Sequence, residues 1–155
     1  MPGFYFVEPG SRLLVTCYWG ADTPTAIPAL RSRRSADPAV AQAMAHIVDA
    51  TAVAPDPGYP ADLARTVAHS YAGALDAVAH LPTVIVSHEG EIFGEARAFA
   101  TIAGLSDPRL RLMVVQSWEE AGQILGQNLA GVEAEVRRRR DEAMGRETSS
   151  TDRGK

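Results

Sequence analysis

Short apolar runs rich in β-branched residues alternate along most of this chain with longer runs of helical period. The clearest are Thr83–Ser87, TVIVS, and Leu110–Gln116, LRLMVVQ. Both are continuous apolar runs, which is typical of strands that are buried on both faces of a sheet. Each is followed by a helical pattern, and strands that alternate with helices imply a mostly parallel sheet with right-handed crossovers. The pattern therefore predicts an α/β fold.

The N-terminal segment has a different pattern. Two β-rich runs, Phe4–Val7 and Leu13–Trp19, flank the turn residues Pro9 and Gly10, which predicts a hairpin. A further strand is predicted at His46–Ala54. We therefore expect one small α/β domain. It has a four- or five-stranded mixed sheet with the hairpin at one edge, and about four helices cover it.

The last predicted helix carries an apolar stripe that is longer than a small sheet needs. This helix begins at the capping box Ser117–Glu120 and is expected to end near Met144. We predict that the far part of the stripe forms a homodimer interface, and packing on the same chain is the alternative. The interface residues are Leu125, Leu129, Val132 and Val136. The domain then spans residues 1–144, and residues 145–155 form a disordered polar tail.

Charge and hydropathy exclude several kinds of partner. The chain has 15 basic and 19 acidic residues, a net charge of -4, which gives no general attraction to nucleic acid or anionic membranes. The run Arg137–Arg140 lies among acidic residues, which favours a solvent-exposed helix with internal ion pairs. No apolar stretch reaches the roughly 18–20 residues that span a bilayer. No signal peptide is recognised, and we expect a cytoplasmic protein.

Metals and cofactors are not expected. Cys17 is the only cysteine, and the four histidines are far apart in the sequence. His69 and His80 fall on one predicted helix, but eleven residues of helix separate them by roughly 16 Å. The chain contains no phosphate-binding loop of the Walker type, no Gly-x-Gly-x-x-Gly and no Gly-x-Ser-x-Gly. These absences argue against nucleotide binding and against serine hydrolase chemistry.

The turn Ser87–Glu91, SHEGE, is the most polar point between a predicted strand and its helix. It lies at the carboxyl end of a parallel strand and at a helix N-terminus, where ligands and anions bind in α/β sheets. A capped turn and an enzyme with His88 as the base are the alternatives. The predicted ligand-binding residues are Asp49, Tyr59, His88, Glu89, Glu91 and Arg97.

The order and spacing of these segments resemble the STAS-like domains (sulphate-transporter and anti-sigma-factor-antagonist domains), in their SpoIIAA-like bacterial branch. The resemblance covers roughly Phe4 to Gly126, about four fifths of the chain. The segments that carry it are PGSRLLVTCYWG, ALRSRRSADPAV, HIVDATAV, TVIVSHEGEIFGEARAFATIAGL and LRLMVVQSWEEAGQIL.

The resemblance implies a regulatory or binding domain without catalysis, whose partner is another protein or a small apolar or amphipathic ligand. In the best-known antagonists of this family, a phosphorylated Ser or Thr lies at the start of the helix that follows the third strand. Here the corresponding segment reads GYPADL and contains neither residue. The phosphorylation switch is therefore not carried over to this chain.

Overall fold

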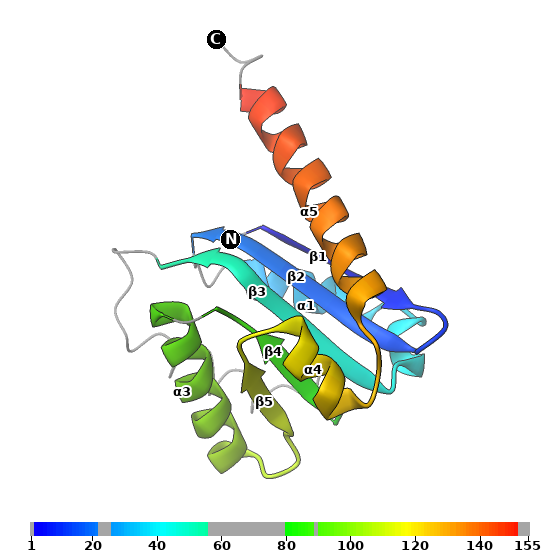
Figure 1. Cartoon of the computed structure of the whole chain (residues 1–155), viewed down its shortest axis with the longest axis vertical. Helices are drawn as coiled ribbons and strands as arrows, with labels where there is room; N and C mark the ends of the chain where they lie inside the picture. The colour runs from blue at the N-terminus through cyan, green and yellow to red at the C-terminus, as the bar shows by residue number, and fades with distance from the viewer. Residues whose placement is uncertain (1, 22–25, 56–79, 89, 152–155) are drawn as a thin grey trace.

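The computed structural model describes residues 2–21, 26–55, 80–88 and 90–151. Its strands form one sheet in the order β1-β2-β3-β4-β5, in which β1 is antiparallel to β2 and the other neighbours are parallel (Figure 1). This confirms the α/β fold with the hairpin at one edge. The strands are β1 Gly3–Glu8, β2 Leu13–Ala21, β3 Ala45–Ala54, β4 Thr83–Val86 and β5 Leu112–Val115.

The described helices cover both faces of the sheet. Figure 1 shows α4 and α5 in front of the sheet and α1 behind it, and α5 extends past the end of the strands. The segment around His69, where a helix is predicted, lies outside the described residues. None of the helices described combines the length and the apolar character that crossing a membrane requires. The helices are α1 Ala26–Ser35, α3 Glu91–Ser106, α4 Trp118–Leu125 and α5 Ala130–Thr151, with a short 3-10 turn at Val40–Gln42.

Alternation along the strands places buried side chains on both faces of the sheet. The larger core lies under α4 and α5, where Val15 and Ile47 on paired strands are fully buried. On the other face, α3 packs on β5 through Ala103 and Leu112. Adjacent side chains of a strand point to opposite faces, so Met113 belongs to the first core and Leu112 to the second.

The predicted C-terminal helix is two helices. Its start is confirmed, because the Ser117 side chain caps α4 by accepting a hydrogen bond from the backbone N–H of Glu120 at 3.1 Å. The helix ends at Gly126, which has the left-handed conformation at φ 65°. The N–H of Gln127 then donates to the carbonyl of Gly122 at 2.9 Å, which is the Schellman pattern of a helix end.

The segment after this turn starts α5. Asn128 Oδ1 accepts the backbone N–H of Ala130 at 3.1 Å and so satisfies one of the unpaired amides at the new helix start. The predicted boundary at Met144 is also wrong. α5 continues through Thr151, seven residues past that boundary. Residues 152–155 lie outside the described part of the chain.

Because the helix ends at Gly126, the apolar residues that follow it pack on the sheet of the same chain. Leu129 is 4% exposed and Val136 is 1% exposed, and both belong to the core under α4 and α5. Leu125 and Val132 are partly buried and pack against the same core. Leu129 and Val136 therefore pack on the same chain and are not available for the predicted interface, whereas the homodimer itself stays a prediction. The turn at Gly126 is the physical reason, because it redirects the chain across the sheet.

Two glycine-to-alanine substitutions in this region are expected to have opposite effects. A Cβ atom at Gly122 would lie 2.6 Å from the backbone oxygen of Gln127, so Gly122→Ala must displace the turn. We expect it to lower the free energy of unfolding by about 2 kcal/mol, as overpacked sites do.

Gly131 is exposed near the start of α5, and a Cβ atom there would meet open space. Gly131→Ala should raise stability by about 0.5 kcal/mol. Urea denaturation of both variants measures the difference, and equal effects would contradict this account of the turn.

Candidate functional site

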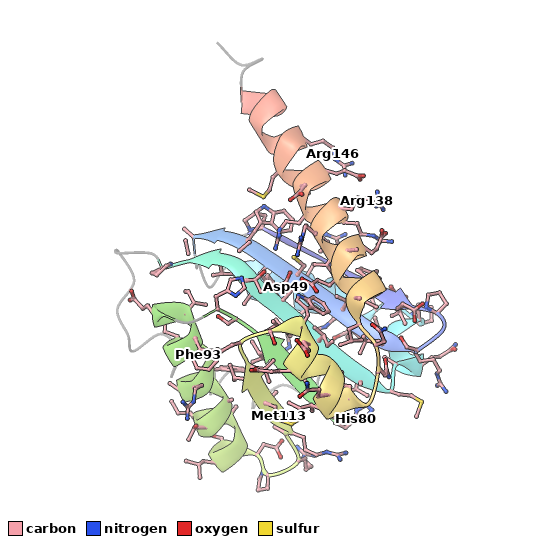
Figure 2. All side chains as sticks on the ribbon, in the orientation of Figure 1. Asp49, His80, Phe93, Met113, Arg138 and Arg146 are labelled. Carbon is pink, nitrogen blue, oxygen red and sulfur yellow. The ribbon has the colours of Figure 1, made fainter. Side chains whose placement is uncertain are left out.

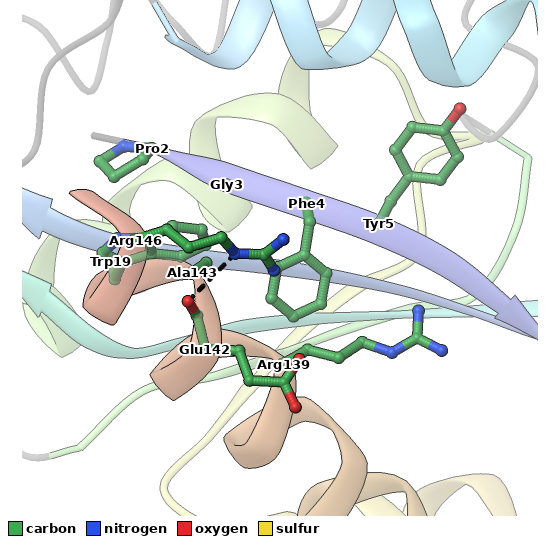
Figure 3. Close-up of a pocket in the computed structure, with 9 residues that line it drawn as sticks. All are labelled: Pro2, Gly3, Phe4, Tyr5, Trp19, Arg139, Glu142, Ala143 and Arg146. Atoms are coloured by element: carbon green, nitrogen blue, oxygen red, sulfur yellow. Dashed lines mark hydrogen bonds between the residues drawn. The ribbon is translucent and has the colours of Figure 1, made fainter. Parts of the chain in front are cut away.

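A pocket of about 350 Å³ lies between the start of the hairpin and α5 (Figure 3). It combines residues from the two ends of the described chain, which only the fold brings together. One part comes from β1 and β2, and the other comes from α5. The lining residues are Pro2, Gly3, Phe4, Tyr5, Trp19, Arg139, Glu142, Ala143 and Arg146.

Aromatic rings from the two paired strands form the hairpin side of the pocket. The rings of Phe4 and Trp19 lie 5.8 Å apart between centroids, tilted by 49°. Phe6 lies two residues along β1 on the same face, with its ring 6.3 Å from that of Phe4. Trp19 is 5% exposed, so the core holds its ring in place. The hairpin thus supplies a fixed apolar floor.

One face of α5 forms the opposite wall. Arg139, Glu142, Ala143 and Arg146 follow each other by three, one and three positions, which places all four on the same side of a helix. The Arg139 guanidinium lies over the Phe6 ring at 4.2 Å, and its Nε donates to Glu135 Oε1 at 2.6 Å. The wall therefore presents arginine side chains beside the aromatic floor.

Ion pairs along α5 engage the carboxylates nearest the wall. Arg138 donates from Nη1 to Glu142 Oε1 and from Nη2 to Glu135 Oε1, the latter at 2.7 Å. Hydrogen bonds from Arg138 and Arg139 lower the pKa of Glu135 to about 2, so it stays charged and remains a partner for them. Arg146 donates from Nε to the backbone carbonyl of Glu142 at 3.2 Å, as Figure 3 shows. Arg139 and Arg146 thus line the pocket, and the nearby carboxylates of Glu135 and Glu142 are bound by arginines of the same helix.

A buried polar cluster fastens α5 to the sheet. Asp49 on β3 is 1% exposed, and Arg140 on α5 donates from Nη1 to Asp49 Oδ2 at 3.4 Å and to Thr51 Oγ1 at 3.2 Å. The backbone N–H of Thr51 donates to Asp49 Oδ1 at 3.0 Å. Figure 2 shows Asp49 on the strands and Arg138 and Arg146 along α5. Because Arg140 is next to Arg139 in the sequence, this anchor also positions the wall of the pocket.

Cys17 is part of the same cluster, and its environment makes it unreactive. Its thiol is fully buried and lies 3.6 Å from Asp49 Oδ2, to which it donates. Burial and then the negative charge of Asp49 raise the pKa of Cys17 far above its ordinary value. The nucleophilic form of cysteine is the thiolate, so Cys17 stays a protonated structural group.

The structure places Asp49 beside Val86, next to the turn Ser87–Glu91, but commits its side chain to other partners. Ser87 is buried, His88 and Glu91 are exposed, and the described contacts of Asp49 are with Cys17, Thr51 and Arg140. Asp49 was predicted to join this turn from a second segment, but its carboxylate is bound by Arg140 of α5 and by Cys17.

The remaining predicted ligand residues do not form a described cluster. Arg97 is exposed on α3, where its guanidinium lies 5.9 Å from the ring of Phe93. Tyr59 and Glu89 lie outside the described residues. The sequence interpretation missed Phe4, Trp19 and the α5 wall. In the sequence, Arg139 and Arg146 share one face of a helix. This spacing indicates a site only when α5 is known to face the hairpin.

A second buried polar group lies on the opposite face of the sheet. His46 is 1% exposed, and its Nε2 is 2.9 Å from Thr16 Oγ1. Arg34 of α1 donates from Nη1 to the same Thr16 oxygen at 3.3 Å. Burial, and secondarily the charge of Arg34, holds the pKa of His46 well below its ordinary value, so the ring is neutral. Its burial and its partners give it a structural role.

Neither a metal site nor a matching protein adds to this geometry in the described part of the chain. In the part of the chain that the structure describes, no three His, Cys, Asp or Glu side chains gather as a metal site would require. Comparisons of the chain with protein-family models, with curated proteins and with solved structures found no match. A function is therefore inferred from the pocket, its charges and its anchor.

Proposed function

We propose that this protein is a non-catalytic binding domain of the STAS-like type, which acts through the pocket between the hairpin and α5. The observation that carries the proposal is the pocket itself, with an aromatic floor from β1 and β2 and an arginine-bearing wall from α5. A volume of about 350 Å³ falls within the range of small-molecule sites. The N-terminal hairpin followed by parallel strands and alternating helices supports the STAS-like interpretation.

The chemistry around the pocket favours binding over catalysis. In the nearby buried cluster, the Asp49 carboxylate accepts hydrogen bonds from both Cys17 and Arg140. Asp49 is 1% exposed and Cys17 is fully buried, so a molecule in the pocket does not meet a free nucleophile or base from this cluster. His46 lies on the other face of the sheet under α1. The polar groups on the pocket wall are arginines and an ion-paired glutamate, which orient ligands rather than transform them.

Native mass spectrometry of protein purified from its own cells tests the proposal, because it detects a bound small molecule or a bound protein. We expect a bound species with the unaltered chain and its loss in Ala143→Phe, which fills the pocket from α5. Ala134→Phe is the matched control on the same helix, since Ala134 does not line the pocket. Circular dichroism checks that both variants fold.

Three outcomes would reject the proposal. The first is the absence of any bound species from the unaltered chain. The second is a species that survives Ala143→Phe but is lost in His88→Ala, which would place the site at the turn Ser87–Glu91, the alternative that an enzyme would require. The third is equal retention of the species by Ala143→Phe and Ala134→Phe.

A further inference from the structure

We infer that the pocket takes a small planar aromatic molecule that carries one anionic group. This inference rests on the proposed function, because it names the ligand class of the same pocket. It follows from the two unlike sides of the site. The hairpin side recognises the aromatic ring, and the α5 side recognises the charge.

The hairpin side fits an aromatic ring. Phe4 and Trp19 are tilted at 49° with 5.8 Å between their centroids, so their ring edges and faces meet the pocket at different angles. A planar ligand can lie against one ring and edge-on to the other, and both arrangements are favourable for aromatic pairs. The volume of about 350 Å³ is near the lower end for ligand sites, which limits the ligand to one or two rings.

The α5 side fits an anion. Among the residues that the structure describes, the Nη groups of Arg139 and Arg146 donate to no protein acceptor, since each arginine uses only its Nε. Glu142 also lines the pocket, but Arg138 binds its carboxylate, which reduces its repulsion of an anion. A guanidinium fork with two unused donors matches a carboxylate, sulfonate or phosphate group.

The preference for an anion has to come from these two arginines rather than from the protein as a whole. The chain has a net charge of -4, which opposes the approach of an anion. A measured preference for an anionic ligand would therefore be local. It should depend on Arg139 and Arg146 and not on arginines elsewhere on the same helix.

The test uses the full chain, labelled with ¹⁵N, and follows the indole N–H signals of Trp19 and Trp118 by NMR. Three probes of one shape are titrated: 2-naphthoate, the neutral 2-naphthalenemethanol and the cationic 2-naphthylmethylammonium. We expect naphthoate to shift the Trp19 signal and to bind at least tenfold more tightly than the alcohol, and the cation to bind weakest. Trp118 lies in the core under α4 and should not respond.

Single substitutions then locate the source of the preference. Arg146→Gln and Arg139→Gln should each bring the affinities for naphthoate and the alcohol to within about threefold. Arg137→Gln is the control. Arg137 is exposed on the same helix, pairs with Glu133 at 2.9 Å and does not line the pocket. Arg146 is exposed, so its variant stays informative even if Arg139→Gln disturbs the contact with Phe6.

The three failures are distinguishable. Equal binding of the three probes at Trp19 overturns the anionic ligand class and leaves the pocket as a binding site. A naphthoate preference that survives both arginine substitutions overturns the role of α5 in recognising the charge. If no probe shifts Trp19, the ligand class fails, while the proposed function is decided separately by the loss of the native species in Ala143→Phe.

Discussion

Arg140→Met is expected to lower the free energy of unfolding by about 3 kcal/mol, because it leaves the carboxylate of Asp49 buried without its cation. Asp49 is 1% exposed and the Arg140 side chain is 16% exposed, so water does not replace the lost cation. Methionine keeps much of the length of the arginine stem, so the loss measures the charge and its hydrogen bonds rather than a cavity. Urea denaturation at neutral pH gives the value.

The control for this prediction lies one helical turn away. Arg137→Met removes an arginine that is 65% exposed and pairs with Glu133 on the surface, so we expect a change within about 0.5 kcal/mol. A double-mutant cycle with Asp49→Asn then isolates the pair. The double variant should lose less than the sum of the two single losses by about 1–3 kcal/mol. Additive losses would mean that Arg140 stabilises α5 by packing alone.

The second large effect is a loss of stability in weak acid that is due to His46. Its folded pKa lies well below the ordinary value because the ring is buried and Arg34 is nearby. As the pH falls through about 6.5, the unfolded chain therefore binds a proton at His46, while the folded chain leaves the ring neutral. The contribution is fully present above that pH and is lost as the pH falls, at up to about 1.4 kcal/mol per pH unit. Between pH 7 and pH 5 the loss is at most about 2 kcal/mol, the limit in which the folded ring takes up no proton.

Denaturation curves at several pH values between 5 and 7 test this expectation. His46→Gln removes the titrating ring, so the slope of stability with pH should flatten by that amount whatever its effect at pH 7. His88→Gln is the matched control, because it makes the same substitution at an exposed histidine. An unchanged slope in His46→Gln would show that the buried ring can accept a proton without loss of stability.

The strands and the hairpin were predictable because the signals for them are local. TVIVS and LRLMVVQ are continuous apolar runs, and Pro9-Gly10 separates two β-rich segments. The structure confirms a hairpin edge and parallel pairing from β2 to β5. The start of α4 was also local, since Ser117 and Glu120 form their cap within one turn. Elements whose cause lies within a few residues can be predicted from sequence.

The end of α4 was also encoded locally, but its signal was misread. The apolar stripe from Trp118 to Val136 keeps a helical spacing, which favours one continuous helix. Gly126 and Asn128 instead form the end of one helix and the start of the next. The stripe keeps its spacing because both helices pack on the same face of the sheet. Periodicity reports which residues are buried, and it does not reveal a turn that leaves the buried face unchanged.

By itself, the sequence determined the alternation of strands and helices, the edge hairpin and the burial of the stripe. Only the tertiary structure decided where the candidate site lies. Asp49 and Arg140 are 91 residues apart, and their pairing depends on the direction in which α5 crosses the sheet. That direction follows from the turn at Gly126 and from the packing of Val136 on the core. The same crossing brings Arg139 and Arg146 to Phe4 and Trp19, because side chains distant in sequence meet only through the packing of the elements that carry them.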